Sequence, residues 1–106
     1  MELNEYQEQA HKTSLHNQPI IYPTLGLTGE AGEVADKVKK VIRDNDGVFT
    51  EEKKHQTALE LGDVMWYAAE LAHDLGYTLE EICQMNLDKV FSRQQRNQIH
   101  GSGDER

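Results

Sequence analysis

Two short segments of this 106-residue sequence each carry a pair of carboxylates three positions apart. The pairs are Glu30 with Glu33, and Glu60 with Asp63. Three positions are close to one helical turn, so the two members of each pair would project from the same side of a helix. Four carboxylates that meet repel one another, and a bound cation relieves that repulsion. All-oxygen ligands favour Mg²⁺, with Mn²⁺ as a substitute, and Mg²⁺ commonly bridges to phosphate oxygens.

A single carboxylate pair of this kind is usually no more than a solvated helix surface. Here Gly29, Gly32 and Gly62 lie beside the pairs, although a glycine costs a helix about 1 kcal/mol. Close approach of a backbone or a ligand would explain why these glycines are present. A di-iron carboxylate site is a different chemistry that would require Glu-x-x-His pairs. Glu33 and Asp63 occupy the positions where those histidines would be needed.

The elements that would position these pairs are helices, because strand signals are weak throughout the sequence. The expected helices, in chain order, span 3–16, about 24–43, from after the N-cap Thr50 to before Gly76, and from the Thr78–Glu81 capping box to about Asn97. Short connections between them predict an all-α fold, an antiparallel four-helix bundle.

The second and third expected helices each have an apolar face, and the carboxylate pairs border these faces. The apolar face of the second helix consists of Ala31, Val34, Ala35, Val38, Val41 and Ile42. That of the third consists of Leu61, Val64, Met65, Ala68, Leu71, Ala72 and Leu75. If the two faces pack together, the four carboxylates can meet at one partly buried place.

Length and charge narrow the class of protein. The sequence suits one domain, expected at 1–100 and followed by a flexible tail at 101–106, and its small core would benefit from a partner subunit. A net charge of −8 argues against binding to nucleic acid polymers, which requires clustered Lys and Arg. No signal peptide or membrane span is evident, so we expect no membrane partner and a cytoplasmic location.

The segments from Leu25 to Val34 and from Glu60 to Tyr67 resemble the MazG-like family of all-α nucleoside triphosphate pyrophosphohydrolases. That family is marked by an E-x-x-E pair and a later E-x-x-D pair on two antiparallel helices. The resemblance implies Mg²⁺-dependent cleavage of (deoxy)nucleoside triphosphates between the α and β phosphates, giving a monophosphate and pyrophosphate. It also implies homodimers or dimers of dimers with sites near the subunit interface. The catalytic and metal-binding residues would be Glu30, Glu33, Glu60 and Asp63, and one of the glutamates would activate the attacking water.

Basic residues could bind the triphosphate. Asn86, Lys89 and Arg93 share one face of the fourth expected helix, and the resemblance implies that they contact phosphates. A solvated basic face is the alternative. Lys37 and Lys40 follow Glu33 by about one and two turns and could also reach phosphates, or could serve only as surface ion pairs.

Other residues leave the function open. Trp66 could stack on a base or lie in a subunit interface. The five histidines are expected at the surface, and none of them has the spacing of zinc ligands. One rival activity is that of phosphoribosyl-ATP pyrophosphohydrolase, a related bundle enzyme. Another is a non-catalytic helical partner protein that retains a metal site.

Overall fold

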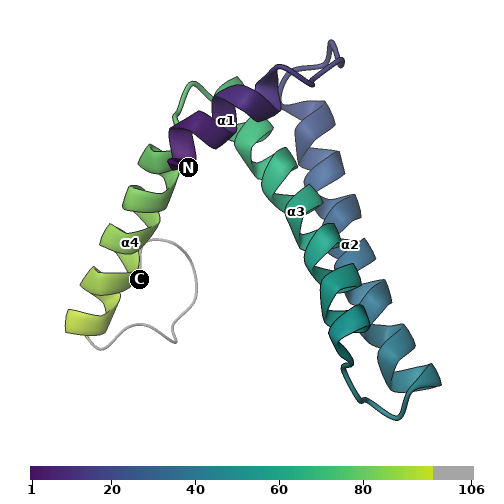
Figure 1. Ribbon diagram of the computed structural model, residues 1–106. Coiled ribbons are helices and arrows are strands. Elements are labelled where there is room, and N and C mark those ends of the chain that lie inside the picture. Colours follow the sequence, from purple (N-terminus) through teal and green to yellow (C-terminus); the bar gives the residue numbers. More distant parts are fainter. Residues whose placement is uncertain (97–106) are drawn as a thin grey trace.

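The computed structural model describes residues 1–96, which fold into four α-helices (Figure 1). These are α1 (Leu3–His11), α2 (Ile21–Asp44), α3 (Glu51–Asp74) and α4 (Leu79–Gln95). The predicted all-α class is confirmed, because the described part of the chain contains no strand. The expected tail at 101–106 and the end of the last helix at Asn97 lie outside the described residues.

The two long helices α2 and α3, each of 24 residues, lie side by side and form a helical hairpin (Figure 1). The short α1 crosses the end of α3 that is remote from the hairpin loop, and α4 leads away from that junction. Within residues 1–96, α4 contacts α1 and α3 but not α2. The packing of neighbouring helices is bundle-like, while α4 forms a separate arm of the molecule.

Local sequence signals set most helix ends. Thr50 caps α3 by accepting a hydrogen bond from the Lys53 amide, as predicted. The Thr78–Glu81 capping box forms in both directions at the start of α4. Gly76 adopts a φ of 86° after α3, and its amide donates to the carbonyl of His73. This left-handed residue turns the chain from α3 towards α4.

The loop between α1 and α2 differs from the prediction. The first helix ends at His11 rather than at residue 16, and the second begins at Ile21 rather than at residue 24. Pro23 fits inside the first turn of α2, because amides there need no intrahelical partner. Before it, Ile20 has φ 69° and ψ −54°, and the Ile21 amide donates to the Pro19 carbonyl over 2.7 Å. This is a strained γ-turn.

The side chain of Gln7 ties α1 to the connection between α3 and α4. Its amide nitrogen donates to the carbonyls of Ala69 (3.2 Å) and Tyr77 (3.1 Å), and its amide oxygen accepts from the Leu79 backbone (2.9 Å). Gln7 is buried, so these bonds are shielded from competing water. One side chain thereby satisfies three backbone groups where three helices meet.

The hydrophobic core of a single chain is small. Its buried hydrophobic members among residues 1–96 are Ala10, Val41, Ala69, Ala72 and Leu79. The predicted apolar faces are only partly buried: Val41 is covered, but Ile42 is 64% exposed and Leu61 is 53% exposed. The predicted faces are thus wider than the surface that one chain covers. None of the helices in residues 1–96 is both long and apolar enough to cross a membrane.

Candidate functional site

Three of the four predicted carboxylates meet between α2 and α3. Glu30, Glu60 and Asp63 each offer an oxygen, and these oxygens all lie within 4.8 Å of one another. We call this group the acid cluster. It forms because the i, i+3 spacing on α3 brings Glu60 and Asp63 to the side that faces Glu30 on α2.

The carboxylates of the acid cluster repel one another, and the pKa of Glu30 is raised. Desolvation raises its pKa above the ordinary value, and the charges of Asp63, Glu60 and Glu33 and a hydrogen bond with Glu60 raise it further. Glu33 itself is exposed, one turn further along α2, and lies outside the group of three. A divalent cation at this place would offset the repulsion, and an all-oxygen donor set suits a hard ion.

The two lysines predicted on α2 have different surroundings. Lys37 reaches the acid cluster, where its ammonium nitrogen lies 3.9 Å from an oxygen of Glu60. Lys40 instead pairs with Asp36 at 2.8 Å, and Lys39 pairs with the same carboxylate at 3.0 Å. Hydrogen bonds from these lysines lower the pKa of Asp36 to about 2. Lys37 therefore contacts the acid cluster, whereas Lys40 is held by Asp36.

Tyr67 packs beside the acid cluster because Gly26 leaves room for it. A Cβ atom on Gly26 would overlap the Tyr67 ring. A hydrogen bond with Tyr22, followed by desolvation, raises the pKa of Tyr67. By contrast, a Cβ on Gly29 or Gly62 would meet open space, and the same holds for Gly32. The glycines predicted to permit close approach therefore have no close neighbour in this chain, and the glycine that packs tightly was not singled out.

Two adjoining cavities share the side chain of Trp66. One cavity, of about 320 Å³, is lined by Glu30, Asp63, Trp66 and Tyr67. The other, of about 390 Å³, is lined by Thr13, Leu15, His16, Tyr22 and Trp66. The indole N–H of Trp66 donates to the Thr13 hydroxyl over 2.9 Å, which fixes the ring between the two spaces. The acid cluster thus opens beside an aromatic-lined cavity.

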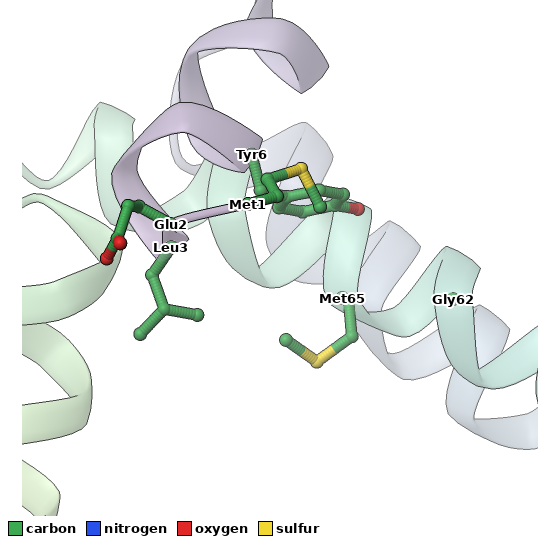
Figure 2. Close-up of a pocket in the computed structure, with 6 residues that line it drawn as sticks. All are labelled: Met1, Glu2, Leu3, Tyr6, Gly62 and Met65. Atoms are coloured by element: carbon green, nitrogen blue, oxygen red, sulfur yellow. The ribbon is translucent and has the colours of Figure 1, made fainter.

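A third cavity lies on another side of α3, between its middle and the start of α1 (Figure 2). Its volume is about 300 Å³, and Figure 2 shows Leu3 and Met65 pointing towards the same open space. Tyr6 also lines it, and burial, followed by the charge of Asp63, raises the pKa of that phenol. Tyr6 therefore lines the apolar space and also senses the charge of Asp63.

The predicted phosphate-binding stripe on α4 is remote from the acid cluster within one chain. Asn86 and Lys89 line a cavity of about 430 Å³ together with Ile82 and Met85. Arg93, on the same helix, is buried. Because α4 does not contact α2, a single chain does not bring this stripe to Glu30.

A second cluster was missed by sequence reasoning. His16, Glu70 and Asp74 each offer a ligand atom, and these atoms lie within 4.8 Å of one another. We call this group the histidine–carboxylate cluster. His16 was expected at the surface, but its side chain is only 9% exposed. The only available signal was the i, i+4 spacing of Glu70 and Asp74, since His16 is more than fifty residues away in sequence. His55 is exposed, and His100 lies outside the described residues.

Comparison with known families matches residues 22–97 to the MazG nucleotide pyrophosphohydrolase domain. The chain belongs to the MazG family. The matched MazG region contains α3, α4 and all of α2 except its first residue, and therefore the whole acid cluster, while α1 and His16 precede it. This assignment supports a hydrolase that acts on nucleotide pyrophosphate bonds.

Comparison with individual proteins adds one relative of this MazG chain. It is 46% identical over 114 aligned positions to the Gene 37 protein of Mycobacterium phage L5, and the alignment covers all of both chains. The name of that phage protein states no activity. No solved structure matches the chain.

Proposed function

We propose that the chain hydrolyses nucleoside or deoxynucleoside triphosphates between the α and β phosphates, releasing a monophosphate and pyrophosphate. The observation that carries this proposal is the acid cluster, in which Glu30, Glu60 and Asp63 converge within a MazG domain. Their donor set fits Mg²⁺, because it is made of oxygen alone and because its mutual repulsion calls for a divalent cation.

Each side chain of the site has a role in this proposal. Glu30, Glu60 and Asp63 hold Mg²⁺, and Glu33 is the fourth ligand or the base that takes a proton from the attacking water. When bound, Mg²⁺ neutralises phosphate charge and orients the pyrophosphate leaving group. Lys37, 3.9 Å from Glu60, supplies positive charge to the phosphates next to the metal ligands. Lys40 would contribute to phosphate binding only after breaking its ion pair with Asp36.

The nucleoside would occupy the aromatic-lined cavity. Trp66 lines both this cavity and the one that contains Glu30 and Asp63, so a ligand that spans the two would pass along the indole. The rings of His16 and Tyr22 are stacked at a centroid distance of 4.8 Å in the same cavity. Aromatic faces of this kind bind bases irrespective of their hydrogen-bonding edges.

A second copy of the chain would complete the site. Ile42 and Leu61 leave apolar surface exposed on the hairpin, and patches of this kind favour association. The arm formed by α4 carries Asn86, Lys89 and Arg93 but does not contact α2 of its own chain. In a homodimer or a dimer of dimers, α4 of one protomer could pack against the hairpin of the other, which supports the role of this stripe as triphosphate contacts.

The test is a panel of ribo- and deoxynucleoside triphosphates, assayed with and without Mg²⁺, with products separated by anion-exchange chromatography. We expect monophosphate and pyrophosphate in equal amounts, and only with the metal present. Diphosphate and orthophosphate would contradict the assigned cleavage position.

Two alternatives are distinguished by adding phosphoribosyl-ATP to the panel and by measuring Mg²⁺ binding beside it. Turnover of phosphoribosyl-ATP alone would favour the related histidine-synthesis activity. Binding of Mg²⁺ without turnover of any nucleotide would favour a non-catalytic partner protein.

A further inference from the structure

The histidine–carboxylate cluster lies where the loop after α1 meets the last turns of α3. Glu70 and Asp74 are one turn apart on α3, and the side chains of Glu70 and Asp74 are 1% and 9% exposed. His16 enters from the loop, with its Nε2 atom 4.0 Å from Oε2 of Glu70 and 3.9 Å from Oδ2 of Asp74. Three potential ligand atoms therefore face one shared point.

In the described part of the chain, no lysine or arginine is paired with Glu70 or Asp74. Every ion-pair partner that the structure gives to Glu70 and Asp74 in residues 1–96 is an imidazole, from His11, His16 or His73. A neutral imidazole does not compensate a buried carboxylate charge. Two buried carboxylates with imidazole neighbours are therefore a setting in which a bound cation stabilises the fold.

The surrounding hydrogen bonds already orient the two carboxylates. Nδ1 of His11 contacts both oxygens of Glu70, at 3.1 and 3.2 Å. The Ile20 amide donates to Oδ2 of Asp74 over 2.9 Å, and this bond fixes the strained γ-turn at Ile20. Supporting contacts of this kind hold metal ligands in direction and tune their affinity.

The donor set selects the class of ion. An imidazole nitrogen with two carboxylates suits zinc and neighbouring first-row transition ions, whereas Mg²⁺ prefers oxygen alone. Ligands of a tetrahedral Zn²⁺ lie about 3.4 Å apart, given metal–ligand bonds of about 2.1 Å. The contacts made by His16 need to shorten by about half an ångström. Nδ1 of His16 accepts from the Gln18 amide over 3.2 Å, so metal binding at Nε2 requires that the ring proton move to Nδ1 and that this bond open.

We propose that His16, Glu70 and Asp74 form a second metal site, distinct from the acid cluster, that binds Zn²⁺ or a similar transition ion. The bound ion joins the loop at His16 to α3 and leaves coordination positions for water or a neighbouring imidazole. His16 lies outside the region matched to the MazG domain, so this site depends on a segment that the family assignment does not include. His16 also lines the cavity proposed above for the nucleoside, so zinc uptake is measured without nucleotide and does not require that the chain hydrolyse one.

The test measures metal uptake by the purified, chelator-treated full-length chain. Zn²⁺ is titrated by calorimetry in excess Mg²⁺, which occupies the acid cluster, and bound zinc is counted by elemental analysis. We expect one Zn²⁺ per chain. His16→Gln and Asp74→Asn should each weaken binding at least about tenfold. His55→Gln removes an exposed histidine elsewhere on α3 and should leave binding unchanged.

A second measurement uses the unmodified chain, in case the variants fold poorly. Diethyl pyrocarbonate modifies imidazoles, and mass spectrometry gives the rate at each site. Because the His16 side chain is only 9% exposed, its rate is compared with and without Zn²⁺ in the same chain. Zn²⁺ should protect His16 and leave His55 reactive. Failure to take up Zn²⁺, or uptake that is lost in Glu60→Gln and kept in His16→Gln, would overturn the proposal and leave the cluster as a hydrogen-bonded support for the loop.

Discussion

The acid cluster and the histidine–carboxylate cluster are both built on α3, about two turns apart, and each brings three potential ligand atoms within 4.8 Å. Their surroundings differ. In the acid cluster Glu30 has carboxylate neighbours, Lys37 lies beside Glu60, and Glu30 and Asp63 line a cavity. Around Glu70 the neighbours are imidazoles, and the carboxylate is buried. The same kind of side chain thus has different surroundings in the two clusters: Glu30 faces an open cavity, whereas Glu70 is buried and ties the loop after α1 to α3, with or without a bound ion.

The largest effect should come from removing a charge at the acid cluster. Asp63→Asn should reduce nucleotide hydrolysis by at least about 100-fold, since a metal ligand matters more than the groups that orient it. The free energy of unfolding should stay the same or rise, because repulsion is relieved. The assay is pyrophosphate release at saturating Mg²⁺, with Glu52→Gln, an exposed carboxylate of α3, as the control. Full turnover in the Asp63 variant would show that the ligands are wrongly assigned.

The same kind of change at the other cluster should act on stability. Glu70→Ala removes the carboxylate that faces His11 and His16, and should lower the free energy of unfolding by about 3 kcal/mol. Urea denaturation measures this loss. Glu8→Ala, on the exposed side of α1, should change stability by less than about 0.5 kcal/mol. If both variants unfolded at the same urea concentration, the contrast between the two clusters would fail.

Two glycines near the acid cluster differ in how closely other side chains pack against them. Gly26→Ala forces a Cβ against the Tyr67 ring and should cost about 1–3 kcal/mol. Gly29→Ala meets open space and should stabilise the metal-free chain by up to about 1 kcal/mol through helix propensity. Thermal unfolding of the two variants, side by side, is the measurement. A subunit packed over Gly29 would reverse the second sign, so dilution to a monomer is the control.

The smallest effect concerns pH. The pKa of Glu30 is raised in the fold, so the stability associated with it is present below the unfolded pKa and is lost as pH rises through the raised pKa. Glu30→Gln should therefore stabilise the metal-free chain at neutral pH, by less than about 1 kcal/mol because solvent screens the cluster. The advantage should vanish below about pH 4. An equal gain at pH 3 and pH 7, measured by urea denaturation, would rule out this electrostatic cause.

Features that depend on neighbours in sequence were predictable. Thr50, Gly76 and the Thr78–Glu81 box identify helix ends because each acts through bonds within a few residues. The convergence of the carboxylates of α2 and α3 followed from helical periodicity and an assumed hairpin. Periodicity did not reveal that Glu33 lies outside the group of three, because that depends on how the two helices are rotated.

Features that depend on distant segments were not predictable. The first helix ends at His11, and the following loop brings His16 to Glu70. This contact joins residues more than fifty positions apart, so neither spacing nor periodicity contains it. The sequence showed how wide the apolar faces are. It did not show that one chain leaves Ile42 and Leu61 exposed. A face wider than its intramolecular partner indicates surface available to another chain.

The three hydrogen bonds of Gln7 have a consequence for how α4 is oriented. Apolar contacts tolerate sliding and rotation, whereas hydrogen bonds to the carbonyls of Ala69 and Tyr77 and to the Leu79 amide are directional. The angle at which α4 leaves the hairpin is thus specified by directional bonds from α1, those of Gln7 and the bond in which Oδ1 of Asn4 accepts from the Glu80 amide, and not by apolar contacts alone. Apolar residues of α4 can accordingly be replaced to suit a partner surface without changing the direction in which that helix points.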